Sequence, residues 1–240
     1  MQQQYEKYTA IHQQVWQQLY QGQIKQIEMY ASKAYLKGMD QCGFNPNSIP
    51  NIDEVNKQLI SITGWRIEIV PGLIDNKLFF ELLGQRRFPA STWLRSMEEL
   101  DYLQEPDMFH DVLGHVPLLA TRDFCRFLEK LATIALLYID DAAIIESISR
   151  LYWYTVEFGL IKEEDELKIY GAGILSSSGE TLYAIASNIP KRIPYNVETI
   201  LAIPYIKDKF QEQYFVIPSY KYLFESLTEL DSLLKQPTIF

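Results

Sequence analysis

The chain has 240 residues, of which 48% are apolar, enough for one large hydrophobic core. Its 31 acidic and 22 basic residues give a net charge of −9, which argues against nucleic acid or anionic lipid as a partner and suits a small zwitterion better. The two cysteines are isolated, and no secretion signal or apolar run of roughly 18 residues opens the chain, so we expect a cytoplasmic protein with reduced thiols.

The glutamine-rich start is expected to be helical, because Ile11, Val15, Trp16 and Leu19 repeat at helical spacing. Periodicity and turn residues predict helices near 8–40, 52–62, 77–86, 97–103, 105–114, 121–137, 141–161, 178–188, 196–202 and 220–233. Short strands are predicted near 65–70, 87–93, 167–169 and 214–217. We therefore expect a mainly α (α+β) fold, with residues 1–240 forming a single compact helical domain with a few short strands.

Two of the three histidines, His110 and His115, stand five residues apart in EPDMFHDVLGHVP. Five residues on an ideal α-helix rotate by about 500°, which leaves the two side chains roughly 140° apart and unable to share an ion. Gly114 and Pro117 are typical of a helix end, so we expect a break that lets His110 project from the last turn and His115 from the exit. Alone, each histidine could equally be an ordinary core residue.

Glu157 follows 42 residues after His115, within a segment that is apolar over most of its circumference. A buried carboxylate needs a partner, which could be a metal ion or a cation such as Arg150 or Lys162. Two imidazoles and one carboxylate on one face of a ferrous ion leave its other face open to dioxygen. The same three ligands could bind zinc and activate water, so a zinc-dependent hydrolase is the alternative from a different class.

Several ordered motifs resemble the catalytic domain of the pterin-dependent aromatic amino acid hydroxylases, in particular the bacterial members that act on phenylalanine. The similarity begins near residue 8 and includes TGWRIEIVPGL, FFELLGQRRFP, LDYLQEPDMFHDVLGHVPLL, LYWYTVEFGL, YGAGILSSSGE and FVIPSY. It implies that family's catalytic-domain architecture and its cofactors, namely Fe(2+), a tetrahydropterin resembling tetrahydrobiopterin, and O2 as co-substrate. His110, His115 and Glu157 match the iron ligands, and Asp107 would orient an imidazole.

The resemblance also implies a pterin site. Phe79 matches the aromatic residue on which the pterin ring stacks. Gly72 and Ile74 match the loop whose main chain binds the pterin's polar edge, and Asp111 matches an acidic position beside the ring. Taken alone, Phe79 would be read as a core residue and Gly72 as part of a turn.

The substrate site implied by the resemblance draws on three motifs. Arg95 matches the arginine that holds the amino acid's carboxylate, a task suited to its planar fork. Ser176 and Ser177 match the family's serine pair, and Trp153 matches an aromatic residue near it. Glu180 closes the same serine motif.

Two positions depart from the family pattern. Ser178 replaces the phenylalanine of animal members or the proline of many bacterial ones, so the resemblance does not predict the detailed shape of that loop. Leu103 replaces a threonine that helps to hold the substrate in animal members, so that hydrogen bond should be missing. Neither change affects the metal ligands.

The resemblance implies a phenylalanine 4-monooxygenase that converts L-phenylalanine to L-tyrosine in phenylalanine catabolism. Tryptophan or tyrosine remains an alternative substrate, because pocket width depends on residues outside the shared motifs. A third interpretation is a non-enzymatic sensor of an amino acid or a pterin that has lost its catalytic site. The intact triad disfavours it. The motifs leave no room for the animal members' regulatory and tetramerisation segments, so a monomer is expected.

Overall fold

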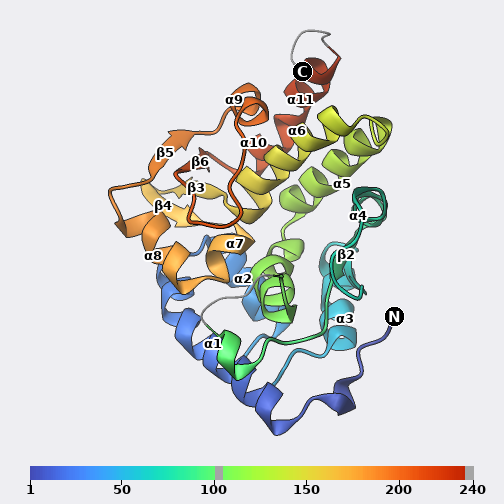
Figure 1. The fold of residues 1–240 in the computed structure, drawn as a ribbon, viewed down its shortest axis with the longest axis vertical. Helices are drawn as coiled ribbons and strands as arrows, with labels where there is room; N and C mark the ends of the chain where they lie inside the picture. The colour runs from blue at the N-terminus through green and yellow to red at the C-terminus, as the bar shows by residue number, and fades with distance from the viewer. Residues whose placement is uncertain (101–104, 236–240) are drawn as a thin grey trace.

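The structure, a computed structural model, describes residues 1–100 and 105–235. The described part of the chain is mostly helical with a few short strands, which confirms the predicted fold class (Figure 1). Leu103 and the end of the predicted helix 97–103 lie outside the described residues. In the described ranges, none of the helices combines the length and the hydropathy that a membrane crossing requires.

The described residues form eleven α-helices. They are α1 (Ala10–Tyr30), α2 (Lys33–Cys42), α3 (Ile52–Ile62), α4 (Asn76–Gly84), α5 (Arg122–Leu137), α6 (Ala142–Tyr152), α7 (Ala172–Leu175), α8 (Ser178–Ala186), α9 (Val197–Ala202), α10 (Tyr220–Glu225) and α11 (Leu227–Leu234). Short 3₁₀ helices are η1 (Tyr5–Lys7), η2 (Met97–Glu99) and η4 (Val116–Ala120), and two π-helices are η3 (Phe109–His115) and η5 (Trp153–Glu157).

The strands form two small sheets. β1 (Arg66–Ile69) and β2 (Arg87–Ala90) pair in parallel. The second sheet has the order β4-β3-β6-β5 and contains β3 (Leu160–Glu163), β4 (Glu166–Ile169), β5 (Lys191–Pro194) and β6 (Gln213–Ile217). Here β3 and β4 form an antiparallel hairpin, whereas β6 runs parallel to both β3 and β5. In Figure 1 this sheet lies on the side of the molecule opposite β2 and α4.

Several predicted helices are divided in the structure. The single helix expected at 8–40 is wrong, because Ala31 and Ser32 are extended and the Ser32 side chain caps α2. The helix expected at 220–233 is divided at Ser226 into α10 and α11. The helix expected at 141–161 ends as η5 and is followed by β3, so its last two positions belong to a strand.

Two strands and one α-helix were not predicted. β3 lies in a region where no strand was predicted, and only Glu164 and Asp165 form the turn between β3 and β4, with φ values of 48° and 71° that suit a two-residue hairpin loop. β5 and α7 were also missed, since each has only four residues and α7 contains a glycine.

A continuous core joins these elements. Its largest fully buried side chains include Trp16 of α1, Tyr35 of α2 and Phe127 of α5. The Tyr35 hydroxyl donates to the carbonyl of Leu113 at 2.5 Å, a buried hydrogen bond that joins α2 to η3. The core therefore holds η3 against its neighbours.

Candidate metal centre

Both histidines lie on one continuous π-helix, η3. The expected helix break between them is therefore wrong, as is the prediction of an α-helix over 105–114. The π-helix closes its hydrogen bonds from i to i+5, so residues five apart lie nearly above one another on the same face. The change of helix type, and not a helix end, brings His110 and His115 together. Pro117 stands in the 3₁₀ helix η4 that follows.

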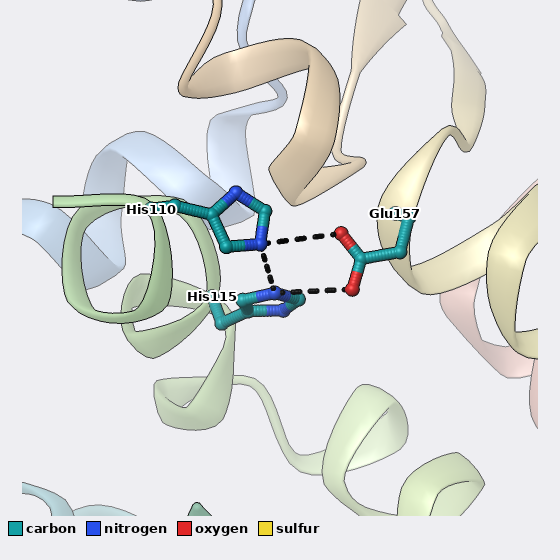
Figure 2. A group of neighbouring side chains, drawn as sticks. All are labelled: His110, His115 and Glu157. Carbon is teal, nitrogen blue, oxygen red and sulfur yellow. Dashed lines mark hydrogen bonds and ion pairs between the residues drawn. The ribbon is translucent and has the colours of Figure 1, made fainter. Parts of the chain in front are cut away.

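Glu157 ends the second π-helix, η5, which continues directly from α6. The Phe158 N–H donates to the Trp153 carbonyl at 2.9 Å, an i to i+5 bond that closes this wider turn. The wider turn directs the Glu157 side chain toward η3, as Figure 2 shows. The predicted convergence of His110, His115 and Glu157 is confirmed.

The three side chains meet closely. Nε2 of His115 lies 3.2 Å from Nε2 of His110 and 3.2 Å from Oε1 of Glu157, and Nε2 of His110 lies 3.6 Å from Oε2 of Glu157 (Figure 2). Donors on adjacent positions of an ion about 2.1 Å away are separated by about 3 Å, whereas opposite donors are about 4.2 Å apart. The observed spacing therefore fits three adjacent ligands of one ion.

The far side of the His110 ring is held by Ser176. The Ser176 hydroxyl donates to the Ala172 carbonyl at 2.8 Å, so its oxygen accepts from Nδ1 of His110 at 2.9 Å. This arrangement assigns the proton to Nδ1 and leaves Nε2 with a free lone pair directed at Glu157. The His115 ring packs on Phe88, with ring centroids 4.7 Å apart.

Electrostatics keep the ligands in the protonation states that a metal requires. Burial lowers the pKa of His110 below its ordinary value, although the Glu157 carboxylate opposes the shift. Burial acts to raise the pKa of Glu157, but His115, His110 and the Gly173 N–H together bring it below the ordinary value. At neutral pH His110 is thus neutral and Glu157 anionic, which makes both ready ligands.

Asp107 does not orient an imidazole directly, contrary to expectation. It is fully buried, and its two oxygens accept from Nε and Nη2 of Arg95 at 2.9 Å each. It also accepts from the main-chain N–H of His110 at 3.2 Å. Nη1 of Arg95 donates to the carbonyl oxygen of Leu100 at 3.3 Å. These three bonds use three of the five N–H groups of the guanidinium, and the other two take no part in them. Asp107 therefore links Arg95 to the start of η3.

Trp153 belongs to a second, partly buried network. Its Nε1 donates to Oε1 of Gln211 at 3.1 Å, and its ring contacts those of Phe158 and Tyr205 with centroids 4.8 and 4.7 Å away. Sequence reasoning gave no indication of Gln211, which lies 58 residues further along the chain. The loop between α9 and β6 is thus attached to η5.

Glu180 anchors the same network from α8. Its carboxylate accepts from the main-chain N–H of Gln211 at 3.1 Å and from the hydroxyl of Tyr214. Burial raises its pKa above the ordinary value, although both hydrogen bonds oppose the shift.

The remaining predicted residues make other contacts. Phe79 of α4 meets the Tyr152 ring edge-on at 5.3 Å, and Asp111 of η3 accepts from Ser91 N at 2.7 Å. Burial raises the pKa of Asp111 above its ordinary value. Gly72 and Ile74 lie in the loop between β1 and α4, while Ser177 caps α8. Within the described ranges we find no hydrogen bond or ring contact from those last three to the triad.

The comparisons with known proteins agree with this geometry. A family profile described as biopterin-dependent aromatic amino acid hydroxylase matches residues 3–239. The chain belongs to that family. One curated relative, the phenylalanine-4-hydroxylase of Ralstonia nicotianae, is 43% identical over 226 residues, which cover 94% of this chain and 72% of the relative.

Solved structures of hydroxylases in this family resemble the chain over nearly all its length. Phenylalanine hydroxylase from Chromobacterium violaceum, in a structure with bound iron(III) and oxidised 7,8-dihydrobiopterin, matches with a TM-score of 0.92 at 40% identity, over 98% of this chain and 85% of that one. A structure of the same enzyme with iron and phenylalanine matches with a TM-score of 0.90 at 38% identity, over 99% and 87%.

Proposed function

We propose that the chain is a phenylalanine 4-monooxygenase that converts L-phenylalanine to L-tyrosine with a non-haem ferrous ion, a tetrahydropterin and dioxygen. The observation that carries the proposal is the convergence of His110, His115 and Glu157 in a member of the hydroxylase family. The named activity of the Ralstonia and Chromobacterium relatives supports phenylalanine as the substrate.

The donor set fits ferrous iron. Two nitrogens and a carboxylate on adjacent positions leave the remaining positions open, as in other non-haem iron oxygenases. When bound, iron and the tetrahydropterin would supply the activation of dioxygen and the two electrons, so that one oxygen atom enters the ring and the other is reduced. The protein's own part is to hold the three ligands, bind both organic molecules and orient them.

Arg95 is proposed to bind the substrate's carboxylate. Its two remaining N–H groups supply donors, and the bidentate pair with Asp107 fixes the plane of the guanidinium. Because Asp107 also binds the main chain of His110, the carboxylate anchor and the metal ligand share one support. This connection would hold the aromatic ring of the substrate at a fixed distance from the metal.

The other site residues are proposed in the roles that the family resemblance gives them. Trp153, Ser176 and Ser177 would line the substrate site, with Ser176 also holding the His110 ring. Phe79, Gly72, Ile74 and Asp111 would bind the pterin. The edge-on packing of Phe79 on Tyr152 fixes the orientation of the Phe79 ring. This packing supports the proposal that the pterin ring stacks on Phe79.

An assay of purified protein tests this function. Ferrous iron, tetrahydrobiopterin, dioxygen and each of phenylalanine, tryptophan and tyrosine are supplied in turn, and the products are separated chromatographically. We expect tyrosine from phenylalanine at the highest kcat/KM. A higher kcat/KM for tryptophan or tyrosine would identify that amino acid as the substrate instead of phenylalanine. Ester or amide cleavage by a zinc-loaded protein without dioxygen, with no hydroxylation, would replace the proposal with a hydrolase.

We further propose that residues 1–240 act as one catalytic domain, as a monomer in the cytoplasm. The single continuous core supports one domain. Light scattering on the purified protein should give a mass near 28.0 kDa. A stable mass of twice that value or more would overturn the monomer.

A further inference from the structure

A short segment, Gly171–Ser176, lies between the two ligand-bearing π-helices. It comprises α7 with one residue on each side. Gly171 and Gly173 face the main chain of Glu157 on η5, while Ala172 faces Gly114 on η3. The segment therefore touches both helices whose separation determines the distance between Glu157 and the histidines.

The contact with η5 leaves no space for a side chain at Gly171. A Cβ atom there would lie 2.5 Å from N of Gly159 and 2.7 Å from the carbonyl carbon of Glu157, and real Cβ contacts are essentially never under 3.0 Å. Both obstructing atoms belong to the main chain, which cannot rotate away. Adding a methyl group would have to displace the backbone of Glu157 itself.

Gly173 and Gly114 extend this close packing. A Cβ at Gly173 would lie 2.8 Å from Cζ of Phe158 and 3.1 Å from the Glu157 carbonyl oxygen. On the opposite side, a Cβ at Gly114 would lie 3.1 Å from both Cβ and O of Ala172. Gly114 does not have a positive φ. Glycine is therefore needed at this position for its small size and not for its backbone freedom.

Hydrogen bonds fix the segment at both ends. The Gly171 N–H donates to the Gly159 carbonyl at 3.0 Å, just beyond Glu157 in the chain. At the other end the Ser176 side chain contacts the His110 ring at 2.9 Å. A displacement of the segment would therefore be transmitted to a ligand on each side of the site.

We propose that Gly171–Ser176 is a spacer that sets the separation of η3 and η5, and that its glycines position the Glu157 carboxylate for the ion. This inference rests on the proposed iron site. Gly114, Gly171 and Gly173 would not touch the ion and are positioning residues. Metal ligands must be held within about 0.5 Å of their working geometry, so a shift of a few tenths of an ångström at each contact matters.

Gly173→Ala is the main test, because its closest obstruction is the edge of a side chain and the protein should still fold. Ferrous-ion affinity is measured anaerobically by competition with a chelator, alongside the melting temperature with and without iron. We expect at least about 10-fold weaker binding, the range seen when groups supporting metal ligands are removed. Gly22→Ala and Gly84→Ala are controls, since added Cβ atoms there meet nothing closer than 3.9 Å.

A second pair of variants tests the spacer from the side of η3. Gly114→Ala should also weaken iron binding by several-fold. Adding Ala172→Gly removes the opposing Cβ and should restore part of the affinity, although the Ala172 carbonyl stays in place. This pair still decides the question if Gly173→Ala fails to fold.

The outcomes separate the two proposals. If the wild-type protein binds no ferrous ion, the proposed function fails and the spacer with it. If the wild type binds iron but both Gly173→Ala and Gly114→Ala bind it within twofold of wild type, the spacer is overturned and the function stands. The spacer is also overturned if these variants lower the metal-free melting temperature while leaving the iron-induced rise unchanged.

Discussion

The side chains of the metal centre have the proton positions and the orientations that a bound cation requires before any cation binds. Nε2 of His110 has no proton, because Nδ1–H donates to Ser176, and it faces a nitrogen of His115 and the carboxylate of Glu157. The Nε2 lone pair of His110 and the Glu157 carboxylate are therefore directed at one point beside Nε2 of His115. A divalent ion at that point would attract all three donors, so the folded protein is expected to favour binding of the metal.

Ser176→Ala should weaken iron binding because it removes the acceptor for Nδ1 of His110. We expect a loss of about 10- to 100-fold in ferrous-ion affinity, measured by chelator competition, with the fold retained. Ser177→Ala is the matched control. It removes a helix cap and should cost about 1 kcal/mol of unfolding free energy, but leave the affinity for iron unchanged. Equal iron affinities of Ser176→Ala and wild type would refute this role.

Arg95→Ala should destabilise the protein as well as weaken substrate binding. It leaves Asp107 buried and without its charged partner, an arrangement that typically costs about 3–5 kcal/mol. Urea unfolding measures this loss, and KM for phenylalanine should rise when assayed below the lowered melting temperature. Arg95→Ala with Asp107→Asn should recover part of the stability. Wild-type stability of the single variant would show that the pair contributes little.

At the scale of elements, the sequence predicts where helices lie better than which kind they are. Periodicity located η3 and η5 within apolar runs, but nothing in the composition distinguishes an i+5 from an i+4 hydrogen-bond pattern. An α-helix would have put His110 and His115 on different faces. β5 was missed because its sequence KRIP has neither alternation nor β-branched runs, and it forms only because β6 pairs with it.

Gln211→Leu tests whether the loop between α9 and β6 positions Trp153. The change removes the acceptor for the indole N–H and the Nε2 donor to Ile206 O. We expect KM for phenylalanine to rise by about 10-fold, equivalent to roughly 1.4 kcal/mol, while iron affinity stays at the wild-type value. Glu212→Gln, which breaks only an exposed ion pair with Lys209 in the same loop, is the control. A KM unchanged by Gln211→Leu would exclude the positioning role.

At the scale of the whole molecule, the triad could be predicted but its support could not. Spacing alone left His110, His115 and Glu157 with ordinary alternatives, and the family motifs chose among them. The pair of Arg95 with Asp107 spans 12 residues, and Ser176 meets His110 across 66. Such contacts depend on how distant segments pack, for which one sequence carries no local signal. The same holds for the link from Gln211 to Trp153.

The stability of the whole fold should depend on pH through Glu180, which joins α8 to β6. Its folded pKa lies above the ordinary value of 4.5 expected in the unfolded chain. The folded state therefore holds a proton that the unfolded state has released, and the resulting stabilisation is full below pH 4.5 and lost as pH rises through the folded pKa. Glu180→Gln removes this titration.

We accordingly expect Glu180→Gln to lower the unfolding free energy more near pH 4 than at pH 7, as measured by urea unfolding at both values. Glu225→Gln, at an exposed ion pair on α10, should show no such difference beyond about 0.5 kcal/mol. If Glu180→Gln lowers the unfolding free energy equally at both pH values, or more at pH 7, the pKa of Glu180 in the folded protein is not raised.

The most direct test of the centre is a crystal structure of the protein loaded anaerobically with ferrous ion, with anomalous scattering recorded at the iron edge. We predict one strong peak within about 2.2 Å of Nε2 of His110, Nε2 of His115 and a carboxylate oxygen of Glu157, with all three on the same side of the ion. A peak bound elsewhere, or one lacking any of these three donors, would contradict the account.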